Sequence, residues 1–136
     1  MEITTMKQFL KPGLVFLSAT MISATVTFAG ELPDTLKIGD SSLGQVLTDT
    51  KGMTLYTFDK DSAGKSACNG GCAKAWPPVL AEGSLAETHD FTKITRDDGS
   101  KQWAYKGMPL YGWVNDKQSG DVTGDKFKGV WHVAKP

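Results

Sequence analysis

This sequence of 136 residues has few of the residues and motifs on which enzyme active sites are commonly built. It contains two histidines and two cysteines. It contains no G-x-S-x-G nucleophile elbow, no H-E-x-x-H zinc motif and no glycine-rich phosphate loop. Its acidic residues are scattered along the chain, which is typical of a solvated surface. We therefore expect a protein that is not an enzyme and that carries no cofactor.

The sequence also lacks an excess of charge of either sign. It has 15 Lys and Arg residues against 15 Asp and Glu residues, and no cluster of basic residues occurs anywhere. Residues 30–136 alone carry thirteen basic and fourteen acidic side chains. Nucleic acids and anionic membranes are therefore poor candidate partners.

A stretch without charged residues runs from Pro12 to Gly30, behind Lys7 and Lys11. A basic segment followed by an apolar one is typical of a secretory signal, and small residues at 27 and 29 predict a cut after Ala29. A permanent membrane anchor is the alternative, but Ser, Thr and Gly dilute the stretch and no basic stop follows. No cysteine lies at the cut to accept a lipid.

These features predict two parts: residues 1–29 as a signal peptide, starting at Met1 or Met6, and residues 30–136 as one small domain. The mature protein is expected to be periplasmic or secreted, with no stable membrane anchor after cleavage.

Secretion also determines how Cys68 and Cys72 are interpreted. In an oxidising compartment paired thiols usually form a disulfide, and Asn69-Gly70-Gly71 leaves the backbone free to bring the two sulfurs together. A redox pair would more usually have the C-x-x-C spacing. The sequence therefore predicts a structural disulfide.

A phrase of eleven residues occurs twice. KGMTLYTFDKD, residues 51–61, returns as KGMPLYGWVND, residues 106–116, with six identical positions. The same offset relates Gly44 to Gly99 and Trp76 to Trp131, so the domain is an internal duplication with repeats at about 36–81 and 91–136. The second copy has Thr123 and Phe127 in place of the two cysteines, so the disulfide belongs to one repeat only.

Short apolar runs between Gly- and Pro-containing turns predict strands, and 71–76 alone looks helical. The expected strands are 36–38, 45–48, 53–58, 91–95, 102–105, 108–114 and 129–133, with turns at 50–52, 96–99 and 106–107. We therefore predict an all-β fold, a small sandwich or barrel-like domain of two pseudo-equivalent β repeats with one short helical turn.

Alternation along the repeated phrase places apolar residues on both faces of each strand. One face is expected to carry Met53, Leu55, Met108 and Leu110, and the other Tyr56, Phe58, Tyr111 and Trp113. We expect the Met and Leu rows to enter the shared core. The aromatic row either fills the second side of the core or lines a groove for a ligand or partner, and the core interpretation is the simpler one.

Asp61 and Asp116 close the two copies of the phrase and are expected to hold the following loop by accepting backbone N–H groups. The pattern Y-x-[FWY]-x-x-D occurs twice, with CNGGCAKAWPP and GVWHVAKP around it. This ensemble resembles the bacterial secreted-repeat family, predicted lipoproteins with a YxFxxD-type motif. The resemblance implies an extracytoplasmic β-rich protein of two repeats and carries no settled biochemical activity.

Two functions follow. The first is a non-catalytic binding or scaffold module of the cell envelope, whose partner is an unknown envelope protein or small ligand. The second is a periplasmic copper or haem accessory protein, since these metals accept thioether and imidazole ligands. The candidate ligands for that second role are Met53, Met108, His89 and His132.

Overall fold

The computed structural model describes Gly13, residues 31–83 and residues 86–136. Apart from Gly13, the predicted signal peptide lies outside the described residues. None of the helices in the described ranges is long and apolar enough to cross a membrane.

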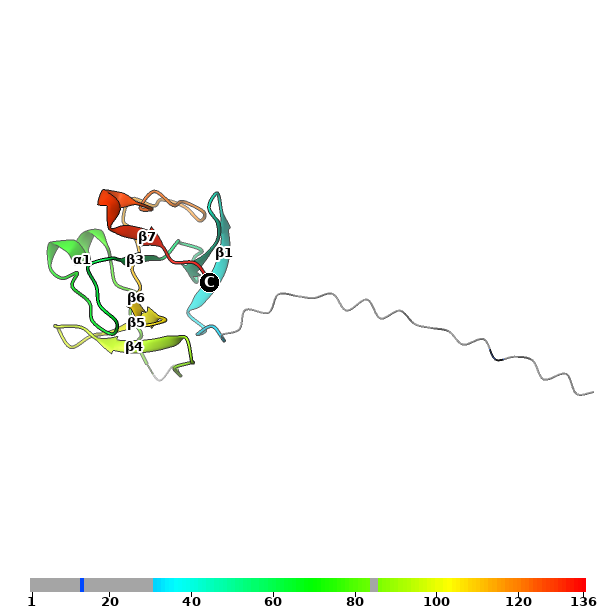
Figure 1. Ribbon diagram of the computed structural model, residues 1–136, viewed down its shortest axis with the longest axis horizontal. Coiled ribbons are helices and arrows are strands. Elements are labelled where there is room, and N and C mark those ends of the chain that lie inside the picture. The colour runs from blue at the N-terminus through cyan, green and yellow to red at the C-terminus, as the bar shows by residue number, and fades with distance from the viewer. Residues whose placement is uncertain (1–12, 14–30, 84–85) are drawn as a thin grey trace, which may run out of the picture.

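The described chain is built from short antiparallel strands, which confirms the predicted all-β class (Figure 1). Three small sheets hold these strands. They are β1 (Leu36–Ser41) with β2 (Gly44–Asp49), β3 (Tyr56–Phe58) with β7 (Trp131–Val133), and β4 (Phe91–Thr95) with β5 (Lys101–Tyr105) and β6 (Met108–Pro109). One short helix, α1 (Gly71–Ala75), and one 3₁₀ turn, η1 (Phe127–Gly129), complete the elements of the described residues.

Local sequence explains the tight turns, as the turn between β5 and β6 illustrates. Between β5 and β6 the backbone reverses at Lys106 and Gly107, whose φ angles are 49° and 85°. Two successive positive φ values match a tight hairpin turn, and glycine adopts the second without steric cost. Pro109 has no N–H group and lies in β6, at the edge of its sheet, where proline is tolerated.

The predicted strands 53–58 and 108–114 are longer than the strands that form. Only Tyr56–Phe58 and Met108–Pro109 are strands, because the hydrogen bonds of each phrase go to several different segments. Leu110 donates to Trp103, Tyr111 exchanges both backbone hydrogen bonds with Tyr56, and Gly112 donates to Pro77.

The last predicted strand is also shorter. Residue 129 belongs to η1, and β7 starts at Trp131. By contrast, β1 and β2 extend beyond the predicted 36–38 and 45–48, up to their connecting turn.

The two repeats exchange their C-terminal segments. The backbone of Ala134, in the second repeat, accepts from Leu47 and donates to Leu55 of the first repeat, both at 2.8 Å. In the same pattern, Val79 of the first repeat accepts from Trp103 at 2.8 Å and donates to Leu110 at 2.9 Å in the second. The repeats are therefore interwoven by an approximate twofold relation, and the β3–β7 sheet also joins one repeat to the other.

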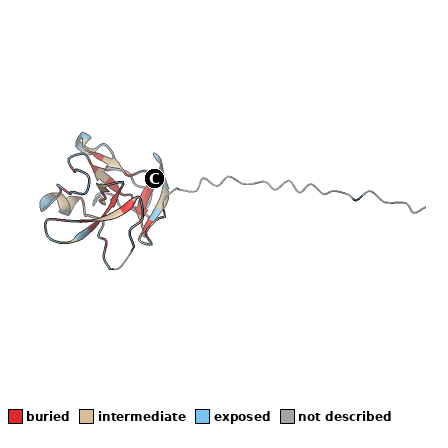
Figure 2. Cartoon of the chain, turned by 60° about the horizontal axis from the view of Figure 1, so that its bottom comes forward, coloured by how far each residue is buried: buried red, intermediate tan, exposed pale blue. Residues whose placement is uncertain are grey.

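Buried residues form two clusters, which run through the middle of the molecule (Figure 2). The leucines of the phrase lie in the first and its tyrosines in the second, so the two faces predicted for the phrase are both buried. The first cluster contains Leu36, Leu47, Leu55, Ala81, Phe91, Trp103, Tyr105, Leu110 and Ala134. The second contains Tyr56, Phe58, Cys68, Trp76, Tyr111 and Trp131.

The expectation that methionines enter the core was wrong. Met53 and Met108 are half-buried and belong to neither cluster. Each follows a turn glycine directly, at the point where the chain is still close to the surface.

Candidate functional site

The two copies of the phrase bind each other through their tyrosines and aspartates. The Tyr56 hydroxyl donates to Asp116 Oδ2 at 2.6 Å, and the Tyr111 hydroxyl donates to Asp61 Oδ2 at 2.6 Å. Both tyrosine residues are fully buried, with 0% exposure. Each copy therefore supplies the acceptor that the other copy's tyrosine needs, which explains why the phrase occurs twice.

Burial governs the titration of these groups. Removal from water raises the pKa of Tyr56 and of Tyr111 far above the usual range, and the hydrogen bond to a carboxylate raises each pKa further. Burial also raises the pKa of Asp61, although the Tyr111 hydroxyl, the Ala67 N–H and the Arg96 charge act in the opposite direction. The phenols therefore stay protonated and act as donors.

The second oxygen of each aspartate holds the loop that follows, as predicted. Asp61 Oδ1 accepts the backbone N–H of Ala67 at 2.7 Å. Asp116 Oδ1 accepts both the N–H and the hydroxyl of Thr123, at 3.0 and 2.6 Å. One carboxylate thus connects a buried tyrosine of the other repeat to its own loop.

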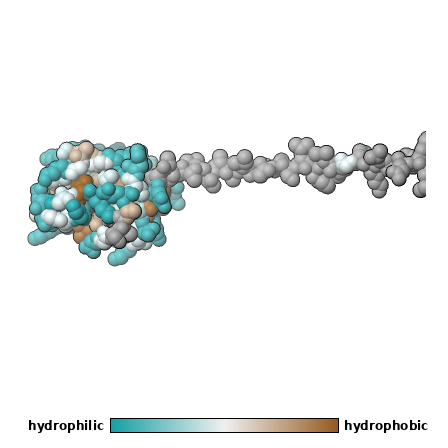
Figure 3. All heavy atoms as spheres, turned by 90° about the horizontal axis from the view of Figure 1, so that it is seen from below, coloured by the Kyte–Doolittle hydropathy of each residue, from teal (hydrophilic) through white to brown (hydrophobic). Residues whose placement is uncertain are grey.

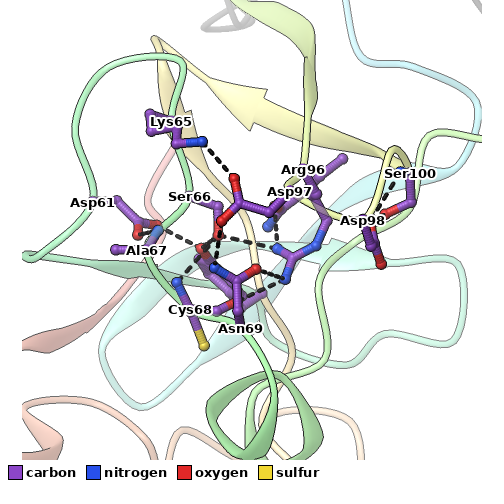
Figure 4. Close-up of polar contacts among 12 residues, drawn as sticks. Asp61, Lys65, Ser66, Ala67, Cys68, Asn69, Arg96, Asp97, Asp98 and Ser100 are labelled. Carbon is purple, nitrogen blue, oxygen red and sulfur yellow. Dashed lines mark hydrogen bonds and ion pairs between the residues drawn. The ribbon is translucent and has the colours of Figure 1, made fainter.

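A buried arginine reinforces the loop of the first repeat (Figure 4). The Arg96 guanidinium donates to Ser66 Oγ at 3.0 Å and to the Cys68 carbonyl at 2.6 Å. Ser66 Oγ lies 2.7 Å from the Tyr111 hydroxyl, so the network reaches from Arg96 to Asp61. Four side-chain and backbone acceptors satisfy the guanidinium: Ser66, Gln102, Cys68 and Asn69. Arg96 was not recognised in the sequence, where its only signal was a lone arginine in a turn.

Cys68 and Cys72 form a disulfide, as predicted. Cys68 is fully buried in the aromatic cluster and Cys72 is half-buried beside it. The disulfide therefore closes the loop that Asp61 and Arg96 also hold.

Four aromatic rings form a continuous stack. The order is Phe58, Trp131, Trp76 and Trp113, with ring centroids 4.2, 3.8 and 3.9 Å apart. The rings come alternately from the first and second repeats. Reversing the order exchanges Phe58 with Trp113 and Trp131 with Trp76, which are the pairs related by the sequence repeat. The twofold relation therefore passes between the two central tryptophans.

Close packing holds the stack in place. A side chain at Gly124 would approach the benzene ring of Trp76 within 2.7 Å, so only glycine fits there without movement. Tyr56 packs edge-on against Trp76, with centroids 5.4 Å apart. The paired tyrosines and the ring stack are thus parts of one cluster.

A groove of about 370 Å³ lies along this stack. Phe58 and Trp113, Trp76 and Trp131, Cys72 and Phe127, and Ala75 and Val130 line it, each pair related by the sequence repeat. Both repeats therefore contribute equally to the groove, which we call the axial groove. Lys60 and Lys128 also line it, and their counterparts in the other repeat are uncharged, Asn115 and Ala73.

Within the predicted aromatic row, Tyr56 and Tyr111 belong to the core. Trp113 is only partly buried and lines the axial groove. Phe127, Lys60 and Lys128 were not recognised as groove residues in the sequence. The repeat offset, which relates Phe127 to Cys72, was the available signal.

The candidate metal ligands lie at separate elements. Met53 follows the turn at 50–52 and Met108 lies in β6. The His89 side chain is 98% exposed beside Asp90, and His132 Nε2 lies 2.8 Å from Asp59 Oδ2. Within the described residues, no group of three His, Cys, Asp or Glu side chains could hold a metal ion. Copper or haem binding therefore stays a prediction without a built site.

Comparison of the sequence with known protein families identifies the two repeats directly. A family described as a secreted repeat of unknown function matches residues 37–80 and residues 92–135, once for each copy of the phrase. No curated protein and no solved structure matches this chain.

Proposed function

This chain belongs to the family of secreted repeats of unknown function, and we propose that it is a non-catalytic binding module of the cell envelope. The observation that supports the proposal is the axial groove. It is lined by four pairs of repeat-related residues, so it exists only when both repeats are assembled. A binding site on the axis gives the duplication a function beyond mutual burial.

The surroundings of the groove favour binding over catalysis. The acid–base groups of the buried network, Asp61, Asp116 and the two tyrosines, all have partners inside the fold. None of them lines the groove. The face seen in Figure 3 is mainly hydrophilic, with a few small apolar patches.

Tryptophan fluorescence provides the test. The purified protein is titrated with fractionated envelope extract, separated into small molecules and proteins, and quenching or a shift of the emission is followed. We expect Trp113→Ala to abolish the response while a cooperative melting transition is retained, since Trp113 is the partly buried ring at one end of the stack. Val114→Ala is the matched control, because Val114 is 44% exposed and lies outside the axial groove.

Two results would contradict the proposal. The first is an unchanged response in Trp113→Ala, which would place binding elsewhere. The second is reproducible turnover of an envelope substrate that is lost when one polar residue is replaced.

A further inference from the structure

We propose that the axial groove binds a small organic anion with a flat apolar body, such as an aromatic carboxylate or sulfonate. The proposal rests on the proposed function, because it assigns a ligand class to the same site. Three features of the groove support it: the way the rings face it, the charges at its border and its size.

The central rings present only their edges to the groove. Trp131 stacks between Phe58 and Trp76, and Trp76 stacks between Trp131 and Trp113, so both faces of each central ring are covered. The edge of an aromatic ring carries partial positive charge, whereas its face carries partial negative charge. The edges of these two central rings therefore favour an electron-rich group over a cation, which would seek a ring face.

The charged residues of the groove have one sign. Lys60 and Lys128 are exposed and line it, and no Asp or Glu of the described residues does. Lys128 Nζ lies 5.6 Å from the centroid of the Phe127 ring, so this ammonium lies above the aromatic wall. Among the lining residues that the structure describes, these two lysines alone break the repeat symmetry of the groove. The charge is thus an addition to a symmetric apolar site.

The size of the groove indicates a small molecule. Its volume of about 370 Å³ falls in the range of sites that enclose small ligands, roughly 300–1,000 Å³. A stable protein partner would need roughly 800 Å² of surface on each side, far more than these ten lining residues offer. Eight of the ten lining residues are apolar, and five of these are aromatic, so the ligand body is apolar.

A pair of dyes tests the proposal. Anilinonaphthalene sulfonate and phenylnaphthylamine share the same ring system, but only the first carries a negative charge. Both fluoresce when they enter an apolar site, and both can quench the tryptophans of the stack. We expect the sulfonate to bind saturably with one site per chain, and the neutral dye to bind at least roughly threefold more weakly, given that each exposed lysine contributes a modest amount.

Single variants assign the effect to the groove. Lys60→Gln and Lys128→Gln should each weaken binding of the sulfonate by roughly two- to fivefold and leave the neutral dye unaffected. Lys37→Gln, on the exposed part of β1, is the matched control and should change neither dye. Trp113→Ala should weaken both dyes. The melting temperature of every variant is measured, because partly unfolded protein also binds these dyes.

The outcomes separate this inference from the proposed function. Equal binding of the two dyes, with no effect of either lysine variant, would overturn the preference for an anion and leave the groove as a binding site. If neither dye binds, or if Trp113→Ala binds the sulfonate as tightly as the parent protein, the assignment of a small anion to this groove fails. The extract titration then decides the proposed function independently.

Discussion

At the scale of single residues, the paired phrases are most directly tested at Tyr56 and Tyr111. A buried hydrogen bond to a charged group contributes about 1.5–3 kcal/mol, and its loss leaves a buried carboxylate oxygen without its donor. We therefore expect Tyr56→Phe and Tyr111→Phe each to lower the free energy of unfolding by about that amount. Urea unfolding measures the change. Phenylalanine keeps the ring in place, so lost packing contributes little.

The double variant Tyr56→Phe/Asp116→Asn is the control for this prediction. The two residues are hydrogen-bonded, so their effects should not add. Tyr56→Phe/Asp61→Asn combines residues of different pairs and should come closer to additivity. Equal additivity in both combinations would contradict the reciprocal pairing.

The same phenols predict a loss of stability at alkaline pH. The folded-state pKa of both tyrosines is raised, so the folded protein keeps protons that the unfolded chain releases near pH 10. The contribution is fully present below pH 10 and is lost as pH rises above it. With two such groups, the free energy of unfolding should fall by up to about 2.7 kcal/mol per pH unit in that range.

Absorbance of tyrosinate near the red edge of the protein spectrum checks this prediction. The signal of Tyr56 and Tyr111 should appear together with unfolding, as followed by circular dichroism. In Tyr56→Phe/Tyr111→Phe the steep alkaline decline should be absent. Ionisation of both phenols in a protein that remains folded would refute the prediction.

At the scale of elements, the loop around α1 is held by three kinds of interaction: the Cys68–Cys72 disulfide, the Asp61 carboxylate and the Arg96 guanidinium. We expect Cys68→Ser/Cys72→Ser to loosen residues 62–76 without unfolding the domain. The closed loop is short, so the lost stabilisation should be about 2 kcal/mol. The second repeat folds its equivalent loop with Thr123 and Phe127 and no disulfide.

Hydrogen exchange followed by mass spectrometry checks the disulfide prediction. Protection should fall in residues 62–76 and stay unchanged in β4 and β5. Chemical reduction of the parent protein should give the same pattern, which controls for the serine side chains. Loss of a cooperative thermal transition would show that the disulfide is essential to the fold.

Elements were largely predictable from the sequence wherever local signals determine them. The strand at 91–95, the strand predicted at 102–105 and observed at 101–105, and the turns at 50–52 and 106–107 follow from alternation and glycine positions. The ends of the strands at 53–58 and 108–114 were not predictable, because the partners of Leu110, Tyr111 and Gly112 lie on three different segments. Alternation predicts a strand and its two faces, but it does not predict how many other segments form hydrogen bonds with that strand.

The candidate site was predictable only in part. The repeat identified Tyr56, Asp61, Tyr111 and Asp116, but not that each tyrosine binds the aspartate of the other copy. A sequence repeat is equally compatible with two independent halves. The order of the rings in the stack depends on the same exchange of segments, so the sequence did not predict it either.

At the scale of the whole molecule, the halves complete each other's core. The backbone of Val79 bridges two residues of the second repeat, and that of Ala134 bridges two residues of the first. A half of about 50 residues is marginal on its own, and here each half also leaves a tyrosine and an aspartate without partners. We therefore expect fragments 31–83 and 86–136 each to be unfolded alone, and to form one folded complex when mixed.

Circular dichroism and tryptophan emission follow the assembly. The stack alternates between repeats, so its near-ultraviolet signal should be absent from either fragment and return in the mixture at a one-to-one ratio. Tyr111→Phe in fragment 86–136 should weaken the complex, since Asp61 of the other fragment then loses its donor. Lys117→Gln should not, because Lys117 is exposed and its side chain donates to Val114 of the same fragment. A fragment that folds by itself with a cooperative transition would show that the repeats are independent units, and the axial groove would then be an interface between two finished domains and no longer a product of folding.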